Sequence, residues 1–140
     1  MSNRKQVQIA LDIIRFTNIS NDLFDEAAKT ARGERTAKIP EIKSALSQSC
    51  DAITNYSRLI LSFFNDLQAK EQAAAGLAIF GINIDEIIEH NTDFLIKSAK
   101  VKKDTLAAID QSSLNDVATY IDNSITPLPL VRKSPLKVGG

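Results

Sequence analysis

Apolar residues recur along most of the chain at the spacing of an α-helix, and the strongest run begins at Pro40. Its inner positions alternate in steps of four and three residues: Ile42, Leu46, Ser49, Ile53, Tyr56, Ile60, Phe63 and Leu67. A second apolar row, which includes Leu59, Ala73 and Phe80, widens this face enough for two neighbouring helices. A seam that keeps its phase over this length is typical of coiled-coil packing. The pattern predicts one helix from residue 40 to about residue 80.

The end of this long helix is set by the residues that can turn the chain. Gly81 can adopt the left-handed cap conformation, and Asn83 can cap the next helix, so we expect the turn at residues 80–83. Gly76 costs only about 1 kcal/mol inside a helix and need not end it. A turn near Gln68–Glu71 is the alternative, and it would give a more conventional four-helix bundle.

Helices are also predicted before and after this run. The first extends from about Asn3 to Arg32 and is closed by Gly33, followed by a polar connection. The next begins near Ile84, and its inner stripe includes Asn91. Its pattern weakens at Lys102-Lys103.

A last helix, capped by Ser112 or Ser113, ends by about Ser124. The sequence therefore predicts an all-α protein. We expect residues 1–125 to form one domain, an elongated antiparallel bundle of three to four helices with a long heptad-patterned hairpin.

The hairpin predicts a protruding apolar tip. A helix over residues 40–80 would be about 60 Å long and would extend past the first helix, which is shorter by about ten residues. The predicted tip, residues 73–82, contains these candidate interface residues: Ala74, Leu77, Ile79, Phe80 and Ile82. Such a tip should not stay bare in water, so it would self-associate, insert into a membrane or lipid surface, or pack under the first helix.

Residues 126–140 differ in kind, because they contain three prolines, three cations and no acidic residue. Prolines at 127 and 129 prevent a regular helix there. One interpretation is a frayed terminus. The other is an extended basic tail that docks a protein partner. Its candidate docking residues are Leu128, Leu130, Arg132, Lys133, Leu136 and Val138.

Composition changes this picture little. The 140 residues include 17 Lys plus Arg and 17 Asp plus Glu, so the net charge of zero gives no global attraction for nucleic acid, which we do not expect as a partner. The single cysteine, Cys50, excludes a disulfide within one chain and favours a reducing compartment. The N-terminus does not resemble a secretory signal, and no apolar run reaches the ~18 residues of a spanning helix, so we expect a cytoplasmic protein.

Candidate catalytic and metal-binding residues are few. Glu86 and His90 share a helix face and could share a metal, but His90 is the only histidine and a solvated acidic face explains the cluster better. Cys50 has no candidate base near it in sequence, which favours a small structural residue over a nucleophile. The sequence contains no phosphate-binding glycine loop and no nucleophile elbow. We expect no enzyme activity, no cofactor and no metal site.

The function that these patterns favour is a non-enzymatic interaction or scaffold protein. We expect a homo-oligomer that self-associates through its hairpin and docks a protein partner through its C-terminal tail. The alternative is a membrane- or lipid-surface-active protein that uses the apolar tip at residues 73–82.

Overall fold

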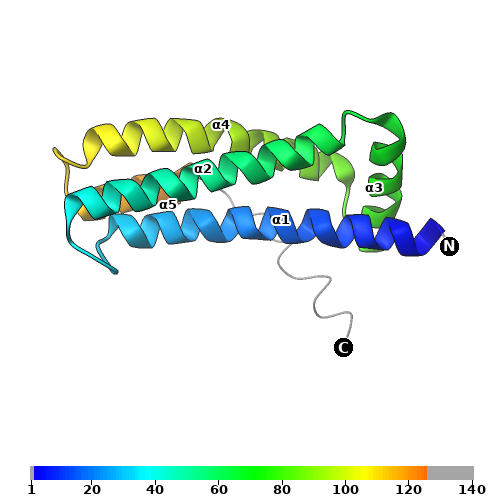
Figure 1. Cartoon of the computed structure of the whole chain (residues 1–140), viewed down its shortest axis with the longest axis horizontal. Coiled ribbons are helices and arrows are strands. Elements are labelled where there is room, and N and C mark those ends of the chain that lie inside the picture. Colours follow the sequence, from blue (N-terminus) through cyan, green and yellow to red (C-terminus); the bar gives the residue numbers. More distant parts are fainter. Residues whose placement is uncertain (1, 126–140) are drawn as a thin grey trace.

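The computed structural model describes residues 2–125, with side chains from Arg4 onward. Within that range every regular element is an α-helix, which confirms the predicted all-α class. The helices are α1 (Ser2–Ala31), α2 (Ile39–Phe63), α3 (Leu67–Ile79), α4 (Ile84–Ala108) and α5 (Leu114–Ser124). Figure 1 shows α1, α2, α4 and α5 lying along the long axis of the molecule, whereas α3 stands across one end.

The predicted connection after α1 is present. Gly33 has a φ of 79°, and its N–H donates to the carbonyl of Thr30 at 3.0 Å, so the chain turns where only glycine adopts the conformation at little cost. Helix α2 then begins at Ile39 with Pro40 in its first turn, where the missing N–H has no helical partner to lose.

The predicted ends around α4 and α5 are also confirmed. Gly81 has a φ of 72°, and the side-chain oxygen of Asn83 accepts from the N–H of Asp85 at 2.8 Å, which starts α4. Helix α4 continues without a break through Lys102. The hydroxyl of Ser113 caps α5 by accepting from the N–H of Asp116 at 3.1 Å.

The prediction of a single helix over residues 40–80 is wrong. Helix α2 ends at Phe63, and α3 begins at Leu67 after Asp66, whose carboxylate accepts from the N–H of Ala69 at 3.1 Å. The alternative turn at 68–71 lies nearer to this break, but those residues are inside α3. The chain turns at residues 64–66 and again at Gly81. Helix α3 therefore stands across the end of α2 and α4 and packs on α1, and within residues 2–125 no two-helix tip protrudes (Figure 1).

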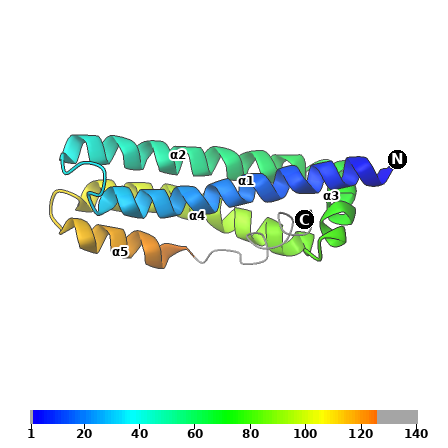
Figure 2. The ribbon, with the colours of Figure 1, turned by 90° about the horizontal axis from the view of Figure 1, so that it is seen from below.

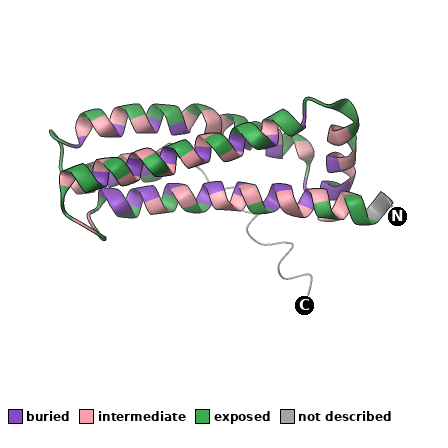
Figure 3. Cartoon of the chain, viewed as in Figure 1, coloured by how far each residue is buried: buried purple, intermediate pink, exposed green. Residues whose placement is uncertain are grey.

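The close approach of α3 to α1 depends on Gly76. A Cβ atom at this position would lie 2.0 Å from the main-chain oxygen of Gln6 and 3.1 Å from the Cβ of Ala10. Ala73, Gly76 and Leu77 are all buried, and Figure 3 shows buried residues where α3 meets α1. The small side chains of α3 let its backbone rest on that of α1.

The buried face of α2 shares Ile42, Leu46, Ile53 and Ile60 with the predicted seam, but it has Cys50 and Ser57 in place of Ser49 and Tyr56. The aromatic residues assigned to the seam lie at its edge: Tyr56 stacks on Phe16 of α1 with ring centroids 5.5 Å apart, and Phe63 is exposed. The observed buried residues of α2 are Ile42, Leu46, Cys50, Ile53, Ser57 and Ile60. A small side chain, Ser57, thus lies in the interior where the aromatic Tyr56 was expected.

Two apolar clusters are separated by a polar belt, which we define as Thr17, Ser20, Asn21, Ser57 and Asn91. One cluster joins α1, α2, α4 and α5 around Phe24 and Phe94, and the other joins α1, α2, α3 and α4 around Leu77 and Ile87. Every residue of the belt is at most 2% exposed. Asn91 lies on the predicted inner face of α4, and its amide nitrogen donates to the hydroxyl of Thr17 at 3.2 Å and to the carbonyl of Ile87 at 3.0 Å.

Helix α5 is much shorter than the helices beside it. It has 11 residues, against 30 in α1 and 25 in α4. Figure 2 shows that α5 ends while α1 and α4 continue toward α3. Helix α5 therefore runs beside only part of the length of α1 and α4 (Figure 2).

Candidate interaction site

The five predicted tip residues do not form one exposed surface. Leu77 and Ile82 are 0% and 2% exposed and belong to the core, while Ala74 and Phe80 are half-buried. Of these five, Ile79 alone is exposed. An exposed apolar tip is therefore not formed by residues 73–82. The alternative, in which this segment packs under the first helix, is the one that the burial of Leu77 and Ile82 bears out. The six predicted docking residues of the tail lie outside the described residues.

An exposed apolar surface lies instead on the seam between α1 and α2. We call it the seam patch and define it as Ile9, Phe16, Leu59 and Phe63. Leu59 is 55% exposed and Phe63 is 38% exposed, although both are large apolar side chains. The four residues line a hollow of about 220 Å³, together with Asp12 and Ile13 of α1. Large apolar side chains beside a hollow are typical of surfaces that another molecule covers.

Charges of both signs border the seam patch. The guanidinium group of Arg15 lies 3.3 Å from the carboxylate of Asp12, and it also lies over the ring of Phe16, 5.3 Å from the ring centroid. The ring of Phe16 also stacks on the ring of Tyr56. The patch thus combines a stacked aromatic ring, a hollow and a rim that carries one charge of each sign.

Sequence reasoning named Leu59 and Phe63 but placed both on inner rows of α2. The signal that separates them is the pair of adjacent apolar residues, Leu59-Ile60 and Phe63-Phe64, repeated four residues apart. Ile60 and Phe64 are the buried members of these pairs. Because neighbouring residues of a helix point about 100° apart, the other members must lie on a different face.

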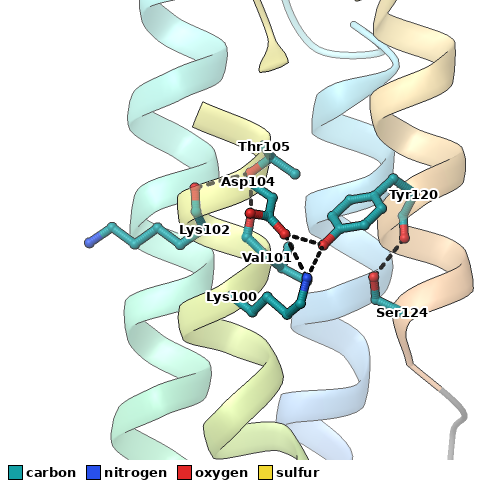
Figure 4. A network of polar contacts seen from close by, with 7 residues as sticks. All are labelled: Lys100, Val101, Lys102, Asp104, Thr105, Tyr120 and Ser124. Carbon is teal, nitrogen blue, oxygen red and sulfur yellow. Dashed lines mark hydrogen bonds and ion pairs between the residues drawn. The ribbon is translucent and has the colours of Figure 1, made fainter. Parts of the chain in front are cut away.

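A second group of polar side chains joins α4 to α5. The hydroxyl of Tyr120 donates to the carboxylate of Asp104 at 2.5 Å, and the ammonium group of Lys100 lies 2.9 Å from the same carboxylate (Figure 4). The hydrogen bond from Tyr120, followed by that from Lys100, lowers the pKa of Asp104, and the bond to Asp104 raises the pKa of Tyr120. The hydrogen bonds thus stabilise the charged carboxylate of Asp104 and the neutral phenol of Tyr120. Because Asp104 lies on α4 and Tyr120 on α5, these bonds hold the two helices together.

A hollow of about 300 Å³ lies beside this group and is lined by both helices. Asp104 and Asp116 are its two carboxylates, and Thr105, Ala108 and Val117 supply most of the rest of its wall. The carboxylate of Asp104 is already engaged by the Tyr120 hydroxyl and the Lys100 ammonium group.

The two residues considered for chemistry are held by packing. Burial, followed by the nearby charge of Asp51, raises the pKa of the Cys50 thiol to about 11, so the thiol stays protonated at neutral pH. Burial lowers the pKa of His90 from 6.5, and the nearby charge of Asp93 opposes this effect. The imidazole ring of His90 packs edge-on against the ring of Phe94, with the ring centroids 4.3 Å apart. Over residues 2–125 no three His, Cys, Asp or Glu side chains are grouped so that they could hold a metal ion.

Comparisons with known proteins add no relative: no family model matches the chain, and neither a curated protein nor a solved structure matches it. Across the part of the chain that the structure describes, the helices are too short or too polar for any of them to cross a membrane. The candidate site therefore rests on the geometry of the seam patch.

Proposed function

We propose that this chain is a non-enzymatic helical interaction or scaffold protein, an elongated antiparallel bundle that self-associates and also docks a protein surface through its C-terminal tail. The seam patch is the observation that supports self-association. It lies on the hairpin formed by α1 and α2, not on the long hairpin expected from the sequence. Pairing with a second molecule would remove its exposed Leu59 and Phe63 from water, which is favourable for large apolar side chains.

The occupant that fits the seam patch is a second copy of the chain. In a two-fold pairing the same patch is used twice, so the protruding Phe63 of each copy enters the hollow of the other. The rim favours this pairing because it carries both Asp12 and Arg15, which can meet their opposites across the two-fold axis. A net charge of zero removes long-range repulsion between copies.

The lipid-surface alternative loses its support from the tip. Leu77 and Ile82 pack in the core, so residues 73–82 present few apolar side chains to a membrane. We therefore propose protein association alone.

Light scattering during size exclusion, over a range of protein concentrations, tests the proposal. The unmodified chain should give the mass of a dimer that dissociates on dilution, and the double variant Leu59→Ser, Phe63→Ser should remain a monomer. Ile96→Ser is the matched control, because Ile96 is 61% exposed but lies on α4, away from the seam patch, and this variant should still dimerise. A monomer at every concentration of the unmodified chain, or equal dimerisation of all three proteins, would exclude self-association through this patch.

A further inference from the structure

Helix α3 and the α1 wall of the seam patch share one layer of apolar packing. Ile13 of α1 lines the hollow of the patch, and it is also 5% exposed and part of the buried cluster around Leu77 of α3. Ile9 and Phe16, the two α1 members of the patch, are partly buried and pack against the same cluster. The α1 wall of the patch is therefore the outer side of a cluster to which α3 contributes.

The α2 wall of the patch is backed by the same cluster. Each of its exposed members precedes a buried one, because Leu59 is followed by Ile60 and Phe63 by Phe64. The rings of Phe63 and Phe64 also meet edge-on, with their centroids 6.1 Å apart. Ile60 and Phe64 both pack in the cluster around Leu77. A change in the packing of α3 is thus passed to both walls of the patch through side chains that touch or adjoin it.

Helix α3 also rests directly on the stretch of α1 that carries the patch. A Cβ atom at Gly76 would lie 2.0 Å from the main-chain oxygen of Gln6 and 3.1 Å from the Cβ of Ala10, so the two backbones approach closely. Ile9 lies between Gln6 and Ala10 in the sequence, and Ile13 follows one turn later. The turns of α1 that α3 contacts therefore supply two of the residues that line the hollow.

Helix α3 is held by few large side chains. It has 13 residues, a length at which a helix is marginal on its own in water. It buries Ala73, Gly76 and Leu77, of which Leu77 alone is large. The large apolar residues that α2 buries are Ile42, Leu46, Ile53 and Ile60. Elements with few buried apolar contacts are the ones that open locally.

The rest of the bundle has a core that does not depend on α3. The cluster around Phe24 and Phe94 is built from α1, α2, α4 and α5, and the polar belt separates it from the cluster around Leu77. Detachment of α3 therefore disrupts one cluster and leaves the other in place. Such separate clusters favour local opening over unfolding of the whole molecule.

We propose that α3 controls self-association: only the form with α3 packed on α1 presents the seam patch, and pairing of two copies in turn holds α3 in place. The inference rests on the proposed pairing through the seam patch and names what regulates it. When α3 detaches, Ile13, Ile60 and Phe64 lose their neighbours. Apolar side chains beside the freed space move inward, so Phe63 follows Phe64 and the hollow that receives the partner copy loses its shape.

The size of the effect follows from the two-fold pairing. Because both copies must have α3 packed, the apparent dissociation constant rises as the inverse square of the packed fraction. A variant in which about one-third of the molecules keep α3 packed should therefore pair roughly ninefold more weakly. Coupling is reciprocal, so a free protein concentration about tenfold above the dissociation constant should lower the detached population roughly tenfold.

Variants at the contact between α3 and α1 test the coupling in the full-length chain. Gly76→Ala pushes α3 away from α1, and Leu77→Ala removes the one large side chain that α3 buries. The methyl resonances of Ile13 report the packed fraction, and sedimentation equilibrium gives the dissociation constant of the dimer. Both variants should pair more weakly, by the inverse square of their packed fraction.

Ala99→Gly is the matched control, because Ala99 is exposed on α4 and the change lowers helix preference without touching α3. It should leave both the packed fraction and the dissociation constant unchanged. A dissociation constant that stays the same in Gly76→Ala or Leu77→Ala while the packed fraction falls would overturn the coupling.

Hydrogen exchange of the unmodified chain tests the reverse direction, so it decides the matter even where a variant fails to fold. The main-chain amides of α3 should exchange before those around Phe24 and Phe94. Their exchange should slow roughly tenfold as the free concentration rises to about tenfold above the dissociation constant. Leu59→Ser, Phe63→Ser should abolish this dependence. A chain that dimerises with unchanged exchange in α3 would overturn the coupling alone, whereas a chain that never dimerises would overturn the pairing and the coupling together.

Discussion

Replacing Gly76 by alanine tests the packing of α3 on α1, the feature that removes the predicted tip. The added Cβ atom would lie 2.0 Å from the main-chain oxygen of Gln6 and 2.7 Å from the carbonyl carbon of the same residue. Ordinary van der Waals contact begins at 3.4 Å, so α3 must move away by roughly 1.4 Å. A main-chain group cannot rotate out of the way as a flexible side chain does.

The expected change in the free energy of unfolding follows from two opposing effects. In an isolated helix, Gly→Ala is stabilising by about 1 kcal/mol. Against α1, overpacking costs about 1–3 kcal/mol and occasionally more. The displacement also loosens Ala73 and Leu77, both 0% exposed, and full burial of a leucine stabilises by about 1.5–3 kcal/mol. Packing therefore outweighs propensity, and we expect Gly76→Ala to destabilise the protein by about 2 kcal/mol.

Urea denaturation followed by circular dichroism measures this change. The matched control is Ala78→Gly, because Ala78 is exposed on the same helix and should show the ordinary preference for alanine, losing about 1 kcal/mol. Alanine should thus be favoured at position 78 and glycine at position 76. If Gly76→Ala raised the stability instead, α3 would not lie against α1 and the reasoning would fail.

Three further predictions concern single side chains. Burial lowers the pKa of His90 below 6.5, so the unfolded state binds more protons than the folded state. The stability that this imidazole contributes is present above pH 6.5 and should be lost as the pH falls through the lowered pKa. Denaturation measured between about pH 7.5 and 5.5 should show this loss of stability, and the His90→Gln variant should not show it. Ser57→Ala removes a buried hydroxyl that has no hydrogen-bond partner among the described residues, and it should stabilise the protein by about 1 kcal/mol. Ser98→Ala removes the 2.7 Å hydrogen bond between the hydroxyls of Ser98 and Thr54 of α2, and it should destabilise the protein by a similar amount. Calorimetry that gives changes in unfolding free energy of the same sign for both variants would contradict this. Tyr120→Phe should raise the pKa of Asp104 toward its ordinary value in a carboxyl NMR titration, and an unchanged pKa would mean that the hydrogen bond does not form in solution.

Several helix ends were predictable from sequence because they depend on local backbone chemistry. Gly33 and Gly81 adopt positive φ values, and Asn83 and Ser113 cap the helices that follow them. Each of these residues acts within a few positions of itself, so one segment contains the whole signal. The all-α class followed from the same local patterns.

The seam patch was not predictable because burial depends on neighbours that the sequence of one helix does not identify. The spacing of four and three residues placed Tyr56 and Phe63 inside and left Ser57 out. In the structure Tyr56 packs at the edge against Phe16, whereas Ser57 is 0% exposed. A small side chain fits where helices approach closely, and a large ring can cover the seam from outside, so size and position outweighed polarity.

The break between α2 and α3 was missed because its signals are weak and its cause is distant. Phe64, the residue at the C-terminal end of α2, has a right-handed backbone conformation with φ −77° and ψ −4°. A glycine is favoured at a helix end when the residue there must be left-handed, so this end has no glycine to reveal it in the sequence. The local signal for the break is Asp66, because aspartate is favoured at the N-cap of a helix. Its carboxylate accepts a hydrogen bond from the N–H of Ala69. A straight helix would keep a few more main-chain hydrogen bonds, each worth about 1 kcal/mol net, but it would leave Leu77 in water. Bending at Asp66 replaces one of those bonds through the cap and buries Leu77 against α1. The contact with α1, eleven positions beyond Asp66, therefore decides where α2 ends.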